Sequence, residues 1–109
     1  MSSIHSKAYF QAFDMSLTNN RWAVKTSGAD TYTVSAEPLT TWSTGVITIY
    51  RSSDGVTPYA LESAKTLTAA EMENQDDCSG YPYLIFQVTT TVASTYVNIT
   101  VNLMRSVST

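Results

Sequence analysis

The chain has 109 residues, of which 43% are hydrophobic and only 14% are charged, and its formal net charge is −3 at pH 7. This length suits one domain that buries roughly two thirds of its unfolded surface, and it excludes two ordinary domains. The 6 lysine and arginine residues are scattered, which argues against a nucleic-acid partner because phosphate recognition needs clustered positive charge.

No apolar stretch approaches the roughly 20 residues that cross a bilayer, so we expect no membrane partner. The first residues, Met1 to Lys7, lack the apolar core of a secretion signal, which predicts synthesis in a cytoplasm or release by lysis. The chain has a single cysteine, Cys78, and no intrachain disulfide can form. Asp76 and Asp77 precede it and disfavour a reactive thiolate, so we interpret Cys78 as a buried or half-buried packing residue.

Residues 1–20 contain apolar side chains that fit neither a strand nor a helix cleanly. Phe10, Phe13 and Leu17 have the spacing of a short helix face, whereas Met15 and Leu17 alternate as in a strand. A terminal segment of this kind either packs under its own domain or docks on a partner. We predict an N-terminal arm or docking segment over residues 1–20 and a β-sandwich domain over residues 21–109.

Short strands separated by turns are predicted along the rest of the chain. The segment from Gly45 to Arg51 is crowded with apolar residues, so both of its faces are expected to be at least partly covered. Thr68 and Glu71 match a capping box, which predicts a short helical turn through residue 74. The other strands are expected at 21–25, 31–35, 57–61, 64–67, 83–90 and 96–103.

The last two of these segments carry the clearest pattern. In residues 96–103 apolar and polar side chains alternate without interruption, which is typical of a strand with one buried and one wet face. Residues 83–90 are rich in aromatic and β-branched side chains. The intervening segment 91–95 has a length suited to a hairpin, so we predict that the two strands pair antiparallel.

Together these elements predict an all-β chain, folded as a single antiparallel β-sandwich or jelly-roll-like domain with an N-terminal arm. A parallel α/β fold is excluded because no helical crossover separates the strands.

The residues for catalysis or metal binding are few. His5 is the only histidine and lies near a terminus, and with one cysteine it cannot supply a zinc site or a catalytic triad. No glycine-rich phosphate loop is present, so we expect no catalytic residues, no cofactor and no enzyme activity. A group of acidic side chains could hold calcium but lacks EF-hand spacing, and a solvated helix end explains it better; it comprises Glu71, Glu73, Asp76 and Asp77.

The aromatic residues permit two interpretations. An exposed platform of tyrosines would suit sugar or protein binding. Alternatively, Trp22, Trp42 and Phe86 fill the core and the tyrosines cover its rim, which we favour. The platform candidates are Tyr32, Tyr50, Tyr81, Tyr83 and Tyr96. Asn98-Ile99-Thr100 matches a glycosylation sequon, which we interpret as chance because it lies within a strand.

The stretch from Leu39 to Val101 contains four segments that carry a resemblance to known proteins: Leu39…Trp42…Gly45-Val46-Ile47-Thr48-Ile49-Tyr50-Arg51-Ser52-Ser53-Asp54-Gly55, Leu67-Thr68, Cys78-Ser79-Gly80-Tyr81-Pro82-Tyr83-Leu84-Ile85-Phe86-Gln87-Val88 and Val97-Asn98-Ile99-Thr100-Val101. In these segments the chain resembles small β-sandwich virion proteins of tailed bacteriophages. These include capsid decoration (cement) proteins and accessory tail domains.

The resemblance implies a structural role on the outer capsid surface of a virion, after synthesis in the host cytoplasm. The expected partners are the major capsid protein and further copies of the chain, as a dimer or trimer. The expected interface consists of Ile4, Tyr9, Phe10 and Phe13 in the arm, with Tyr81 and Tyr83 on the rim. Deletion of residues 1–14 should then preserve the fold and abolish binding. The alternative is a tail-fibre or baseplate module that recognises a host-surface glycan.

Overall fold

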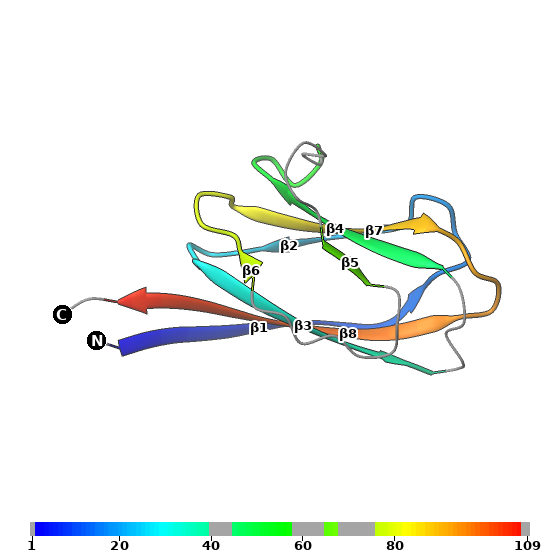
Figure 1. Ribbon diagram of the computed structural model, residues 1–109, viewed down its shortest axis with the longest axis horizontal. Helices are drawn as coiled ribbons and strands as arrows, with labels where there is room; N and C mark the ends of the chain where they lie inside the picture. Colours follow the sequence, from blue (N-terminus) through cyan, green and yellow to red (C-terminus); the bar gives the residue numbers. More distant parts are fainter. Residues whose placement is uncertain (1, 40–44, 58–64, 68–75, 108–109) are drawn as a thin grey trace.

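The computed structural model describes residues 2–39, 45–57, 65–67 and 76–107, and every regular element within these ranges is a β-strand. The strands form two four-stranded sheets in which all neighbours pair antiparallel, and the sheets lie face to face (Figure 1). This confirms the all-β sandwich that the alternating sequence predicts.

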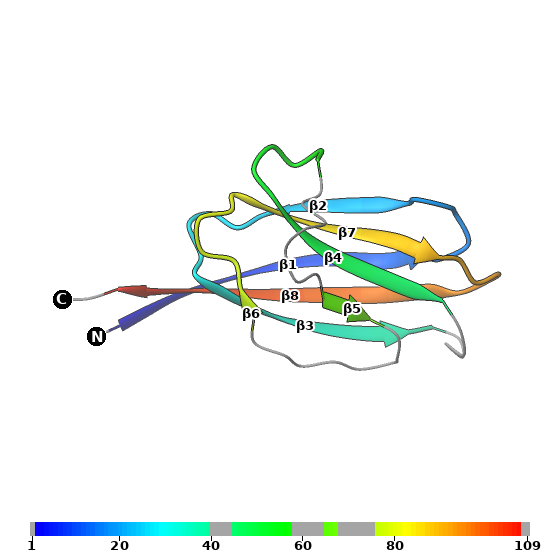
Figure 2. The same cartoon turned by 45° about the horizontal axis from the view of Figure 1, so that its top comes forward.

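The first sheet has the strand order β1–β8–β3–β6, and the second has the order β2–β7–β4–β5. Figure 2 shows β1, β8 and β3 side by side along the long axis of the molecule. The first sheet consists of β1 (Ser2–Asp14), β3 (Thr31–Pro38), β6 (Asp76–Asp77) and β8 (Tyr96–Val107). The second consists of β2 (Arg21–Lys25), β4 (Val46–Ser52), β5 (Lys65–Leu67) and β7 (Tyr83–Thr90).

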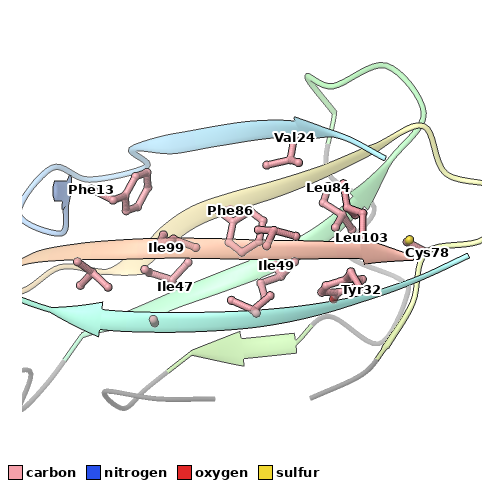
Figure 3. Close-up of a cluster of buried hydrophobic side chains, with 14 of the residues drawn as sticks. Phe13, Val24, Tyr32, Ile47, Ile49, Cys78, Leu84, Phe86, Ile99 and Leu103 are labelled. Carbon is pink, nitrogen blue, oxygen red and sulfur yellow. The ribbon is translucent and has the colours of Figure 1, made fainter. Parts of the chain in front are cut away.

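The core lies between the sheets and follows from the period of two. In β8, Val97, Ile99, Val101 and Leu103 are buried, whereas the residues between them face away from the core. In the facing strand β7, Leu84, Phe86 and Val88 belong to the core in the same alternation (Figure 3), while Ile85 is also buried but lies outside the core cluster. Each fully buried side chain of this size contributes about 1.5–3 kcal/mol. The buried set of β3 and β7 comprises Tyr32, Val34, Ala36, Leu84, Phe86 and Val88.

The two strands predicted at 83–90 and 96–103 are confirmed, but the hairpin that was expected to join them is wrong. β7 pairs with β2 and β4, whereas β8 pairs with β1 and β3, so residues 91–95 cross from one sheet to the other. Two strands that each have one apolar face can bury these faces against each other from opposite sheets, without pairing in the same sheet. The sheets of a sandwich lie about 10 Å apart, a distance that a loop of five residues can span. Main-chain bonds from Met15 N to Thr95 O and from Val92 N to Met15 O, each 3.0 Å, attach the crossing to the end of β1.

The expected N-terminal arm corresponds to an integral strand of the sandwich. β1 pairs with β8 from Ser2, opposite Val107, to Asp14, opposite Tyr96. The sequence period is obscured by a β-bulge between Phe10 and Phe13, where the register shifts by one residue. Because side chains alternate across a strand, the extra residue moves the inward positions from even to odd numbers.

Four aromatic rings link the edges β1 and β2 of the two sheets. Phe10 lies 5.3 Å from Phe13 and 5.3 Å from Trp22, both in edge-to-face geometry, and Trp22 lies 5.4 Å from Phe86 between ring centroids. Phe13 and Phe86 are fully buried, and Phe10 and Trp22 pack against them from the rim. Phe86 thus belongs to the core, as predicted, whereas Trp22 is half-buried at the rim of the core. Trp42 lies outside the described residues.

Other expectations for the second sheet are met where the structure describes them. Ile47, Thr48 and Ile49 in β4 are all buried, so both faces of this strand are covered, as predicted. The strand expected near 64–67 is β5. The helical turn expected over 68–74, and most of the segment expected over 57–61, lie outside the described residues.

Candidate protein-interaction surface

A broad polar surface covers the side of β1, β8 and β3 that faces away from the core. The register places Tyr9 beside Thr100, and Thr100 beside Ser35, so the three strands present one continuous row across the sheet. We call this surface the outer face. Its central row is Tyr9 in β1, Thr100 in β8 and Ser35 in β3, and the neighbouring rows hold Lys7, Asn102 and Thr33 on one side and Asn98 and Glu37 on the other.

Among the described residues, the charged groups of the outer face lie on either side of its central row. His5 and Lys7 lie toward one end, where β1 pairs with Met104 and Asn102. Asp14 and Glu37 lie toward the other, beside Tyr96 and Asn98. Hydroxyl and amide groups fill the region between them, and such groups cost far less to bury against a protein partner than ions do.

The outer face also carries exposed aromatic surface. The side chain of Tyr9 is 57% exposed and that of Tyr96 is 40% exposed. Leu39, which is 53% exposed, follows β3 and donates its backbone N–H to Tyr96 O at 2.9 Å. Exposed tyrosines among uncharged polar groups are typical of the core of a protein interface.

One side chain of the outer face is fixed by the β-bulge in β1. Ala12 has a positive φ of 56°, and its N–H donates to Asn98 Oδ1 at 2.9 Å. The amide of Asn98 therefore replaces a ladder bond that the extra residue would leave unmade. Four residues further along β8, Asn102 Nδ2 donates to Thr33 Oγ1 at 3.4 Å, which ties β8 to β3.

The structure separates the residues predicted for an arm interface. Tyr9 lies on the outer face, whereas Phe10 is half-buried against the core. The prediction that Phe13 binds a partner is wrong because its side chain is fully buried inside the sandwich. The backbone of Ile4 pairs with Arg105, and its side chain lies outside the described residues.

The two predicted rim tyrosines lie away from the outer face, near the second sheet. The ring of Tyr83, at the start of β7, lies against Gly55: a Cβ atom added to Gly55 would be 3.1 Å from the ring. Tyr81 lies under the guanidinium of Arg51, 5.3 Å from the ring centroid. Since Tyr32 is only 2% exposed, the tyrosines named as platform candidates do not form a single platform.

The polar residues of β8 on the outer face were not among the predicted interface residues, although the sequence pattern marks them as exposed to solvent. Asn98, Thr100 and Asn102 are the wet positions of the alternating segment 96–103. Their relation to Tyr9 and Ser35 depends on the neighbours of β8, which alternation alone does not reveal.

A second ordered feature is the loop that follows β4. Asp54 Oδ1 accepts the N–H groups of Thr57 at 2.7 Å and Val56 at 2.8 Å, and also the hydroxyl of Ser52 at 3.1 Å. Arg21 Nη1 in β2 donates to Val56 O at 2.7 Å, which holds the loop against the second sheet. The backbone bonds from Thr57 and Val56 lower the pKa of Asp54 to about 2.

We expect the Asp54→Asn substitution to lower the melting temperature most at neutral pH. The folded-state pKa of Asp54, about 2, lies below its ordinary value of 3.8. Its contribution is therefore complete above pH 4 and is lost as the pH falls through 2. Thermal unfolding at pH 7, 4, 3 and 2 should show the difference from the unchanged protein shrinking with acid. A difference independent of pH would contradict the role of the carboxylate charge.

The described residues offer little for metal or thiol chemistry. They contain no group of three or more His, Cys, Asp or Glu side chains placed to hold a metal ion. Cys78 is fully buried, with Sγ 3.4 Å from Ala29 O, which confirms its interpretation as a packing residue. Of the proposed calcium ligands, Glu71 and Glu73 lie outside the described residues, while the backbones of Asp76 and Asp77 form β6. No helix in the described part of the chain is long and apolar enough to span a membrane.

Comparison with known proteins shows similarity at the level of structure only. No protein-family model and no curated protein matches the chain. The SPBc2 prophage-derived protein YomS has a similar structure, with a TM-score of 0.63 and 14% identity, over 93% of this chain and 95% of YomS.

Two further solved structures share the fold. The PBSX exported protein XepA has a TM-score of 0.69 and 13% identity, over 95% of this chain but only 39% of XepA. Bacillus endospore appendages, which form disulfide-linked pili, have a TM-score of 0.54 and 14% identity, over 98% of this chain and 90% of theirs. These three neighbours, two of them phage-derived and one a pilus protein, share the fold of this chain.

Proposed function

We propose that the chain is a structural protein of a phage particle and that it decorates the capsid by binding the major capsid protein through the outer face. The observation that carries the proposal is the uncharged central row of that face, Tyr9, Thr100 and Ser35, with the exposed ring of Tyr96 toward one end. A partner that covers this surface removes few ions from water, so the cost of dehydration is low.

Two other observations support a structural role. YomS and XepA, which share the fold, are phage-derived. The buried apolar side chains of the described strands pack between the two sheets and form one continuous core. A decoration protein acts by many identical contacts on a symmetric lattice, so moderate affinity at each site suffices.

The proposal is tested with particles that lack the protein. Particles purified from a host in which the coding sequence has been deleted are mixed with the purified protein and sedimented through a density gradient. We expect co-sedimentation with heads at a fixed ratio to the major capsid protein. Binding to tails alone, or to no part of the particle, would contradict capsid decoration.

The Thr100→Glu substitution is expected to weaken particle binding at least about tenfold. Thr100 lies in the middle of the outer face, between Tyr9 and Ser35, and a carboxylate buried there without a partner is costly. Thr90→Glu, at an exposed position in the second sheet, is the matched control and should bind normally. Equal binding of both variants, measured by the same sedimentation, would show that another surface contacts the particle.

A tail module that recognises a host glycan remains the second candidate. The observation in its favour is that Tyr9 and Tyr96 are exposed on one face, about 13 Å apart along the strands by their spacing in the register. Sugar rings stack on such side chains. Glycan-array binding that is lost in a Tyr9→Ala variant would favour this function over decoration.

A further inference from the structure

The first sheet has a long open edge. β1 spans Ser2–Asp14 and lies at the end of the strand order, so within the described residues it pairs with β8 alone. The opposite edge strand, β6, contains only Asp76–Asp77. An open strand edge presents unpaired N–H and C=O groups, which makes it a template for another strand.

The residues that face this edge can be identified from the hydrogen bonds of β8. Met104 O accepts the N–H of Asp30, and Tyr96 O accepts the N–H of Leu39, so even-numbered residues of β8 direct their backbone groups toward β3. Odd-numbered residues of β8 therefore bond to β1, where their partners before the bulge are the even-numbered residues, such as Ala8 opposite Val101. The backbone groups that point to the open edge belong to Ser3, His5, Lys7 and Tyr9.

This run has few of the features that normally block an edge. Residues 2–10 contain no proline, and Lys7 is the only lysine among them. The β-bulge, which would bend a strand away from a neighbour, lies beyond the run, between Phe10 and Phe13. The straight part of β1 thus remains able to accept another strand.

We propose that β1 pairs antiparallel with β1 of a second copy of this chain, about a two-fold axis that passes beside Ser6. The edge-facing positions 3, 5, 7 and 9 are symmetric about position 6. A two-fold axis there sets Ser3 opposite Tyr9, and His5 opposite Lys7, of the other copy. Every edge-facing residue then forms a hydrogen-bonded pair, and the two first sheets join into one continuous sheet.

The surroundings of Ser6 fit this register. Ser6 is exposed, so a second copy can reach the strand at the point where the axis would pass. A register centred on Lys7 would place two lysines opposite each other, which is unfavourable in a cross-strand pair. The centre at Ser6 places two small side chains opposite each other instead.

A disulfide trap tests both the partner and the register. In the proposed pairing Ser6 and its copy form a non-hydrogen-bonded pair with Cα atoms about 4.5 Å apart, within the range of a disulfide. Ser6 is exposed, whereas the natural cysteine, Cys78, is fully buried. The unchanged protein should therefore not cross-link, and it serves as the negative control. We expect the Ser6→Cys variant to be converted almost completely to a covalent dimer under mild oxidation.

Ala8→Cys is the matched control. It lies two residues along the same strand and on the same side, but its copy would be about 13 Å away, too far for a disulfide. Efficient cross-linking of Ala8→Cys without that of Ser6→Cys would overturn the register. A monomer in both variants would overturn the pairing itself.

Sedimentation of the otherwise unchanged chain supplies the second measurement. We expect a dimer, and we expect Lys7→Pro to shift it to a monomer that keeps the β-sheet signal in circular dichroism, because the lost N–H faces the open edge and not β8. The melting temperature should depend on protein concentration in the unchanged chain and not in the variant. A trimer, or a dimer that Lys7→Pro leaves intact, would overturn the proposal. Neither test needs a phage particle, so failure here is distinguishable from failure of the decoration function.

Discussion

Replacing Phe13 with alanine is expected to lower the free energy of unfolding by about 3–5 kcal/mol. The ring is fully buried, lies opposite Val97 in the register and packs against Phe10 in an edge-to-face pair at 87° between ring planes. The substitution removes apolar area, leaves a cavity and breaks an aromatic pair that adds about 0.5–1.5 kcal/mol of its own. Urea denaturation followed by tryptophan fluorescence would measure the change, since Trp22 contacts Phe10.

Tyr9→Ala is the control for this experiment. Tyr9 lies in the same strand but is 57% exposed, so its removal should change the free energy of unfolding by no more than about 0.5 kcal/mol. Deletion of residues 1–14 should unfold the protein, because it removes β1 and uncovers β8. If the truncated protein kept its melting temperature, and if Phe13→Ala were as harmless as Tyr9→Ala, residues 1–14 would be an arm after all.

The strands themselves were predictable because burial on one face imposes a period of two. Residues 96–103 show this directly, and the buried residues of β8 are those that the alternation selects. β1 escaped prediction because one extra residue near Ala12 reverses the alternation halfway along the strand. A bulge stabilised by a distant side chain, Asn98, leaves no signal within the segment itself.

Strand partners were much less predictable than strands. The segment 91–95 is short enough for a hairpin, yet Val92 and Thr95 form main-chain bonds with Met15, far away in the sequence. Whether a short loop folds back within one sheet or crosses to the other depends on which apolar faces meet, and that is a property of the whole sandwich.

The candidate surface was predictable only in part, for the same reason. The sequence predicts Tyr9 and Phe13 as residues of one arm interface, because the side of a strand cannot be read across a bulge; the structure exposes Tyr9 and buries Phe13. Asn98 and Thr100 stood out as wet positions, whereas their neighbours on β1 and β3 emerge only from the pairing. The outer face is thus a consequence of topology.

Gly45→Ala is expected to destabilise the fold by about 2–5 kcal/mol. Gly45 has φ of +96°, and a Cβ atom there would lie 2.7 Å from Val92 Cγ1 and 3.2 Å from Met15 Cε. A side chain at positive φ costs roughly 1–2 kcal/mol, and forcing atoms into a packed site costs about 1–3 kcal/mol more. The clash falls on the segment that crosses between the sheets, where Val92 N donates to Met15 O.

Gly80→Ala separates the two costs. Gly80 has a similar φ of +84°, but a Cβ atom there would meet nothing within 4 Å. Its substitution should therefore cost only the backbone strain, roughly 1–2 kcal/mol. Combining Gly45→Ala with Val92→Ala should recover part of the loss, since removing the Val92 methyl groups makes room for the new one. Equal unfolding free energies for Gly45→Ala and Gly80→Ala would show that Val92 and Met15 move away from the new methyl group without loss of stability. The absence of a side chain at Gly45 would then not be required for the packing of the crossing segment.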